Sequence, residues 1–196
     1  MKSISHSGQI RIWLLSTIIM VILMILIGGV TRLTDSGLSM VEWRPLWGFL
    51  PPISQFEWNR VFELYMKSPE YIFKNKGMSL EEFKEIFFWE YFHRLWGRLI
   101  GIIFIIPLLF FIIVKKIPKS ILSKLFLILF LGGLQGFIGW WMVKSGLVND
   151  PTVSQYRLTI HLSNALLILS LLIWVYLDVK EGVSQIKPDF SFFMFS

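Results

Sequence analysis

Cysteine is absent from the 196-residue sequence, and this absence removes several classes of site at once. Without thiols the chain can form no disulfide, no thiolate metal site and no iron–sulfur cluster. Nor can it attach a prosthetic group covalently through a Cys-x-x-Cys-His motif. Any metal or redox chemistry must therefore use other ligands.

Charge is scarce as well. Only 16% of the residues are charged and 55% are hydrophobic, whereas soluble domains carry nearer a quarter charged residues. The formal net charge is +6, but the basic residues are not gathered into one patch with stacking aromatics, so we expect no nucleic-acid partner. This composition is typical of a protein embedded in a lipid bilayer.

Four apolar stretches are long enough to cross a bilayer. They cover about residues 12–30, 92–114, 121–143 and 158–177, each near the roughly 20 residues that a hydrocarbon core about 30 Å thick requires. The sequence thus predicts an all-α integral membrane four-helix bundle, a single domain over residues 1–196. Pro107 inside the second span should kink that helix unless a neighbour satisfies the carbonyl that it leaves free.

The short loops predict the orientation. The connection between the second and third spans carries four lysines and no acidic residue: Lys115, Lys116, Lys119 and Lys124. The positive-inside rule places this connection, and with it both termini, in the cytoplasm or the mitochondrial matrix. The long segment of about residues 31–89 then faces outward.

The outer segment is predicted to be partly helical. Residues 55–66 and 79–89 have helical patterns, and the second stretch opens with the capping box Ser79-x-x-Glu82 and should continue into the second span. Its tryptophans suit a lid lying at the membrane interface: Trp43, Trp47, Trp58 and Trp89.

Two histidines, His93 and His161, fall inside the predicted spans. Ionisable groups in a bilayer are rare and usually functional. Both spans enter from outside and reach their histidine within the first turns, so the two imidazoles should lie at a similar depth. Imidazoles facing each other across a helix bundle are a usual means of ligating heme iron. We therefore predict His93 and His161 as heme-iron ligands.

Charged residues accompany both histidines. Glu90 lies three residues before His93 and Arg157 lies four residues before His161, each on the histidine's helical face. With Arg94, this set resembles a heme site, in which Arg94 and Arg157 bind the propionates and a carboxylate lies beside the ring. Two other interpretations remain open. A b-type electron-transfer membrane subunit would need the histidines but not Glu90, and an assembly subunit without heme would use them as interhelical hydrogen-bond partners.

Four strings in the sequence resemble the heme A synthase family, membrane enzymes that oxidise heme O to heme A for terminal oxidases. The strings are GGVTRLTDSGLSM at 28–40, EYFHRLWGR at 90–98, LQGFIGWWMV at 134–143 and RLTIHL at 157–162. They follow the family order, and the resemblance reaches from about residue 10 to residue 178. The lack of outer cysteines is similar to the branch found in mitochondria and their bacterial relatives.

The resemblance implies an oxidoreductase that converts a ring methyl of heme O to a formyl group. It also implies two similar four-helix halves, each with a histidine pair: an amino-terminal half for the substrate heme and a carboxy-terminal half for a heme b cofactor. Carried over to this chain, Glu90 is the candidate catalytic carboxylate, and His93 and His161 flank the substrate porphyrin.

This sequence departs from the family by ending at Ser196, where a second half would begin. We therefore expect a heme A synthase or its substrate-heme-binding half, with a truncated, non-catalytic heme-binding fragment as the alternative and heme b in the missing half. The expected partners are heme O, the lipid bilayer, a separately encoded second half, heme O synthase or a second copy of the chain. The expected location is the inner (plasma) membrane of a bacterium in preference to the mitochondrial inner membrane.

Overall fold

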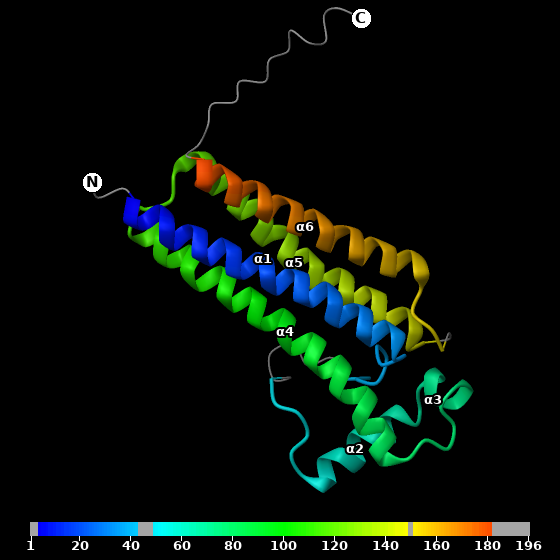
Figure 1. The fold of residues 1–196 in the computed structure, drawn as a ribbon. Coiled ribbons are helices and arrows are strands. Elements are labelled where there is room, and N and C mark those ends of the chain that lie inside the picture. The colour runs from blue at the N-terminus through cyan, green and yellow to red at the C-terminus, as the bar shows by residue number, and fades with distance from the viewer. Residues whose placement is uncertain (1–3, 43–48, 149–150, 182–196) are drawn as a thin grey trace, which may run out of the picture.

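The computed structural model describes residues 4–42, 49–148 and 151–181, and within these ranges the regular secondary structure is entirely helical (Figure 1). Its helices are α1 (Ile4–Leu33), α2 (Gln55–Tyr65), α3 (Pro69–Phe73), α4 (Leu80–Ile113), α5 (Lys119–Gly146) and α6 (Gln155–Glu181). Four of them, α1, α4, α5 and α6, are long and apolar enough to cross a membrane. The predicted all-α four-helix arrangement is confirmed.

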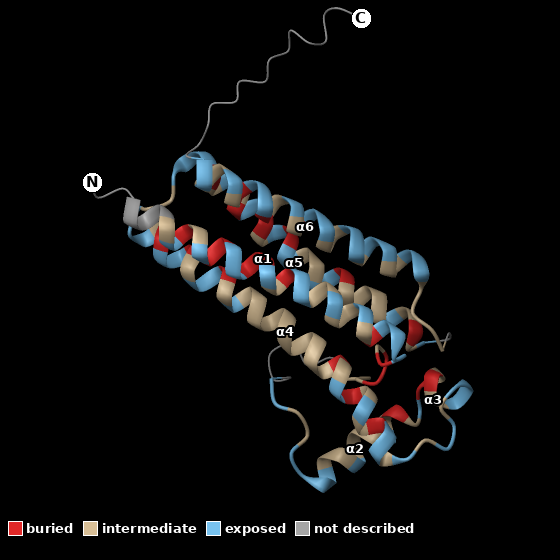
Figure 2. Cartoon of the chain, viewed as in Figure 1, coloured by how far each residue is buried: buried red, intermediate tan, exposed pale blue. Residues whose placement is uncertain are grey.

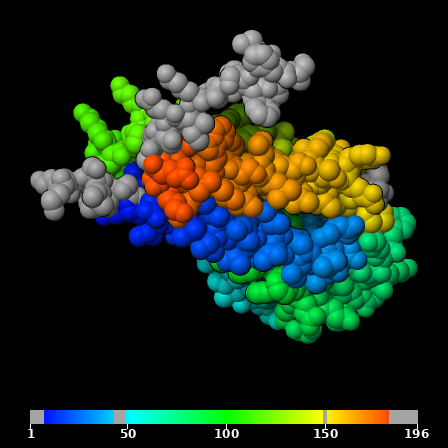
Figure 3. Space-filling view, turned by 45° about the horizontal axis from the view of Figure 1, so that its top comes forward, coloured from blue at the N-terminus to red at the C-terminus, as the bar shows by residue number. Residues whose placement is uncertain are grey.

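The four long helices form one bundle, and α2 and α3 lie beyond one end of it, here called the outer end (Figure 1). Around the bundle, α1 packs along both α4 and α6, and α5 packs along α6. Figure 3 shows α1 (blue) and α6 (orange) side by side on one face. α4 and α5 touch over only a short stretch, and α4 does not pack along α6. α4 and α6 are therefore diagonal partners across the bundle.

Large apolar side chains fill the part of the bundle away from the outer end. The buried cluster combines all four helices and includes Trp13, Leu14, Leu108, Leu125 and Leu172. Many large apolar side chains also lie on the outward faces of the same helices, which Figure 2 shows in blue. An apolar exterior of this kind suits contact with lipid, because helices that satisfy their own backbone can expose apolar side chains there.

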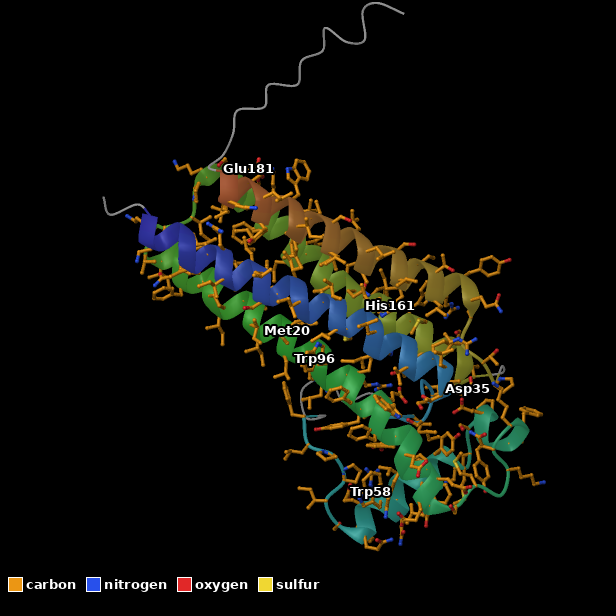
Figure 4. All side chains as sticks on the ribbon, in the orientation of Figure 1. Met20, Asp35, Trp58, Trp96, His161 and Glu181 are labelled. Atoms are coloured by element: carbon orange, nitrogen blue, oxygen red, sulfur yellow. The ribbon has the colours of Figure 1, made fainter. Side chains whose placement is uncertain are left out.

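Two indole hydrogen bonds join α1 and α4. Pro107 has no N–H, so the carbonyl of Ile103, four residues earlier, loses its helical partner, yet α4 continues through the proline. The indole of Trp13 donates to Ile103 O at 3.0 Å, which supplies the partner that an unbroken helix requires. Trp96 donates in the opposite direction to Met20 O at 3.0 Å (Figure 4).

The predicted outer helices are also present. α4 begins after the capping box at Ser79 and runs without a break into the membrane span, as predicted. α3 was not predicted; Ser68 caps it by accepting a hydrogen bond from the N–H of Tyr71, with a proline in its first turn. Of the predicted interfacial tryptophans, Trp43 and Trp47 lie outside the described residues.

A buried carboxyl group anchors the outer helices. Glu70 on α3 is 2% exposed, and its Oε2 accepts a hydrogen bond from the hydroxyl of Tyr65 at 3.0 Å. Asn75 in turn donates to the Tyr65 hydroxyl at 2.7 Å. Burial raises the pKa of Glu70 to about 7; the Tyr65 hydrogen bond opposes this rise, and the negative charge of Glu90 adds to it.

The raised pKa of Glu70 predicts a pH-dependent stability. The folded protein holds this proton more tightly than the unfolded chain, so its stabilising contribution is complete below about pH 4.5 and is lost as the pH rises through about 7. Glu70→Gln mimics the neutral carboxyl and does not titrate. Its thermal unfolding temperature in detergent should match the parent at pH 4 and exceed it at pH 8, by a free energy of at most about 3 kcal/mol. The exposed control Glu63→Gln should show no such change, and a pH-independent difference for Glu70→Gln would contradict the prediction.

The orientation can be tested with single cysteines, because the chain has none of its own. Ser120 lies in the first turn of α5 beside the predicted cytoplasmic connection, and Lys76 lies between α3 and α4; both are exposed. In intact bacterial cells a membrane-impermeant thiol reagent should label Lys76→Cys and leave Ser120→Cys unlabelled until the cells are opened. The reverse pattern would invert the predicted topology.

Candidate functional site

The two predicted histidines face the same layer of the bundle from diagonal helices. His93 belongs to α4 and His161 to α6, two helices that do not pack along each other. Figure 4 labels His161 in the outer part of the bundle.

Two glycines make room for these rings. A Cβ atom on Gly28 of α1 would lie 3.2 Å from Nε2 of His93, and one on Gly139 of α5 would lie 3.0 Å from Cε1 of His161. The His93 ring therefore lies against the backbone of α1, and the His161 ring against the backbone of α5. By contrast, a Cβ on Gly133 of α5 would meet no atom within 4 Å.

His161 has an amide neighbour that sequence reasoning missed. The Gln135 side-chain nitrogen lies 3.3 Å from His161 Nε2 and donates to His161 O at 3.0 Å. Asn164 orients this amide by donating to Gln135 Oε1 at 2.6 Å. The other ring nitrogen, His161 Nδ1, is buried without a hydrogen-bond partner. A lone amide in an apolar, glycine-rich helix was the sequence signal for Gln135.

Glu90 lies at the outer edge of the histidine layer and is 3% exposed. Its Oε2 accepts hydrogen bonds from the hydroxyl of Ser39 and the backbone N–H of Met40, both at 2.7 Å. Its Oε1 accepts a hydrogen bond from Arg94, one turn along α4. We call this set the Glu90 clamp, because it fastens the segment that follows α1 to α4.

The two predicted arginines have different surroundings. Arg94 also donates to Met40 O at 3.2 Å, so it belongs to the Glu90 clamp. Arg157 instead donates to Trp141 O at 2.7 Å and lies over the Trp141 ring, 4.4 Å from its centroid. The structure brings Glu90 and Arg94 together, whereas Arg157 is held against α5.

A cavity of about 290 Å³ opens between the segment after α1, α4 and α5. Its lining is apolar apart from two cations, Arg94 and Lys144. The other lining residues are Met40, Val41, Trp140, Val143 and Leu147. Sequence reasoning did not select Lys144, which looks like a common basic residue at the end of a span.

The side chains available as ligands limit the kind of metal site that the described residues can form. Among the described residues no three His, Cys, Asp or Glu side chains are grouped to hold a bare metal ion. Two imidazoles from opposite sides suit an iron whose four remaining ligands come from a macrocycle. The buried nitrogen of His161 that has no hydrogen-bond partner is compatible with such a ligand.

Residues 11–193 match the COX15-CtaA family model, described as cytochrome oxidase assembly protein. The chain is 56% identical over 170 residues to the heme A synthase of Nitrosospira multiformis, covering 87% of this chain and 48% of that protein. It is 46% identical over 183 residues to the heme A synthase of Parvibaculum lavamentivorans, covering 93% and 53%.

A third relative, the heme A synthase of Agrobacterium fabrum, is 49% identical over 180 residues, covering 92% of this chain and 48% of that protein. The chain thus spans about half the length of the curated relatives it matches. No solved structure matches it.

Proposed function

Because the chain belongs to the COX15-CtaA family of cytochrome oxidase assembly proteins, we propose that it is the substrate-heme-binding half of a heme A synthase. In this function the chain binds heme O between His93 and His161, and the ring methyl of heme O is oxidised to the formyl group of heme A. The relatives named heme A synthase support the reaction class.

The single observation that carries the proposal is that His93 and His161 lie on diagonal helices of the bundle, with Nδ1 of His161 buried and without a hydrogen-bond partner. Each ring lies against a glycine of an intervening helix, so the protein approaches the ligand layer with backbone instead of bulky side chains. The heme supplies the redox-active iron when it is bound. The protein's part is to hold the ring flat, orient its edge and exclude bulk water.

We assign the catalytic carboxylate to Glu90. It lies three residues before His93 and therefore on the same face of α4. A fixed carboxylate beside the reacting methyl can accept a proton from an attacking water or stabilise positive charge that develops there. The Glu90 clamp holds this group in one orientation, which favours such a preorganised role.

The proposal includes a second half, because the relatives are about twice as long as the matched region. That half would hold a heme b that carries electrons away, on a separate chain or on further sequence. The proposed location is the plasma membrane of a bacterium, with the outer end of the bundle on the outside. Heme O synthase is the proposed source of substrate.

Heme ligation predicts a spectroscopic result. The purified chain mixed with heme should show a low-spin, bis-histidine spectrum, and His93→Ala or His161→Ala should lose it or convert it to high spin. Gly139→Ala should weaken heme binding because its Cβ would displace the His161 ring. Gly133→Ala, on the same helix but free of contacts, is the matched control. Heme binding by both histidine variants at parental affinity would refute the ligand assignment.

The role proposed for Glu90 predicts that heme O binding and heme A formation can be separated by mutation. With the second half present, Glu90→Gln should bind heme O but lower heme A formation by about a hundredfold or more, the usual scale of acid–base catalysis. Ser39→Ala removes one hydrogen bond of the Glu90 clamp and keeps the carboxylate. It should therefore retain most of the activity, as should the exposed control Glu85→Gln. Equal losses in Glu90→Gln and Ser39→Ala would make Glu90 a structural residue only.

A further inference from the structure

The cavity between α4 and α5 has the composition of a site for an anion with an apolar body. Its two cations, Arg94 and Lys144, come from different helices, and its other lining side chains are apolar. Lys144 is exposed, and its ammonium lies 5.1 Å from the centroid of the Trp140 ring. No acidic side chain lines this cavity.

The cavity lies immediately outside the histidine layer. Lys144 is five residues beyond Gly139, the glycine that His161 contacts, so it lies about 7.5 Å farther along α5 toward the outer end. Arg94 follows His93 directly, and its side chain reaches back along α4 to Glu90. Both cations therefore lie toward the outer end from the histidine that their own helix carries or contacts, Arg94 from His93 and Lys144 from His161.

Arg94 and Lys144 differ in how far neighbouring groups offset their positive charge. Arg94 is joined to the buried carboxylate of Glu90, which offsets much of its charge. The ammonium of Lys144 lies over the Trp140 ring. A cation over a ring keeps its positive charge available to an anion. Arg157, the other arginine beside a histidine, is directed to the carbonyl and ring of Trp141 and is not among the cavity residues.

From this arrangement we propose that the cavity is a carboxylate subsite. Lys144, with Arg94 beside it, binds a carboxylate on the edge of the porphyrin that His93 and His161 hold. This inference rests on the proposed function and adds a specificity-determining residue, Lys144, to it. Anionic lipid headgroups share this chemistry, but the position of the cavity beside the histidine layer favours the porphyrin carboxylate.

The test compares two probes that differ only at the carboxylates, iron protoporphyrin IX and its dimethyl ester. The full chain in lipid-free neutral detergent is titrated with each probe, and the change in Soret absorbance gives the dissociation constant. Lys144→Met should weaken binding of the free acid about tenfold, as expected for loss of a charge-assisted hydrogen bond. It should change binding of the ester less than twofold. Lys144→Arg should retain most of the preference for the acid.

The matched control is Lys119→Met, which removes an exposed lysine from the opposite end of the same helix and should change neither constant. Parental free-acid affinity in Lys144→Met, with binding still lost in His161→Ala, would overturn the carboxylate subsite and leave the heme-binding proposal standing; a lipid-headgroup site would give this result. Equal weakening of acid and ester would show that Lys144 acts on the fold and would also overturn the inference. Failure of the parent chain to bind either probe would overturn the proposed function together with it.

Discussion

The Glu90 clamp joins the two parts of the structure, and the geometry of the candidate site depends on it. A carboxylate that is 3% exposed would cost several kcal/mol of desolvation if its charge lay unpaired. Here a hydroxyl, a backbone N–H and a guanidinium compensate that cost. The same hydrogen bonds fix the segment after α1 against α4, so Met40 becomes a wall of the cavity and Arg94 is aimed at its rim. Removing this one carboxylate would loosen the wall, the rim and the outer edge of the histidine layer together.

The histidine layer lies between two regions packed with bulky side chains. Toward the inner end, the bundle is filled by a cluster that includes Leu108, Leu125 and Leu172. Toward the outer end, Tyr65, Phe83 and Phe87 form a separate buried cluster. Between them lie the two histidines, Gly28 and Gly139 against their rings, and the amide of Gln135 beside His161. Packing on both sides therefore fixes the positions of the helices that carry the two histidines.

The sequence predicts features that depend on a residue's position along a helix. It does not predict which face of each helix packs against its neighbours. The presence of four membrane-length helices, the capping box at Ser79 and the need to satisfy the carbonyl before Pro107 follow from local chemistry, and all three are confirmed. The similar depth of His93 and His161 follows from counting residues inward from the outer end. The diagonal relation of α4 and α6 depends on which helix faces pack together, and four similar apolar helices carry little signal for that choice. Lys144 was missed for this reason, since only the packing places it opposite Arg94.

The clamp and the chemistry proposed for Glu90 are compatible because a carboxylate has more acceptor positions than the clamp uses. Two oxygens offer about four lone-pair positions. Ser39 and Met40 occupy two on Oε2, and Arg94 occupies one on Oε1. Arg94, which donates to this oxygen, also lines the cavity. One acceptor position on Oε1 is left. A water or substrate group can donate to it while the segment after α1 stays fastened. The clamp thus fixes the plane of the carboxylate that we propose as catalytic, and it leaves one acceptor position for a further hydrogen bond.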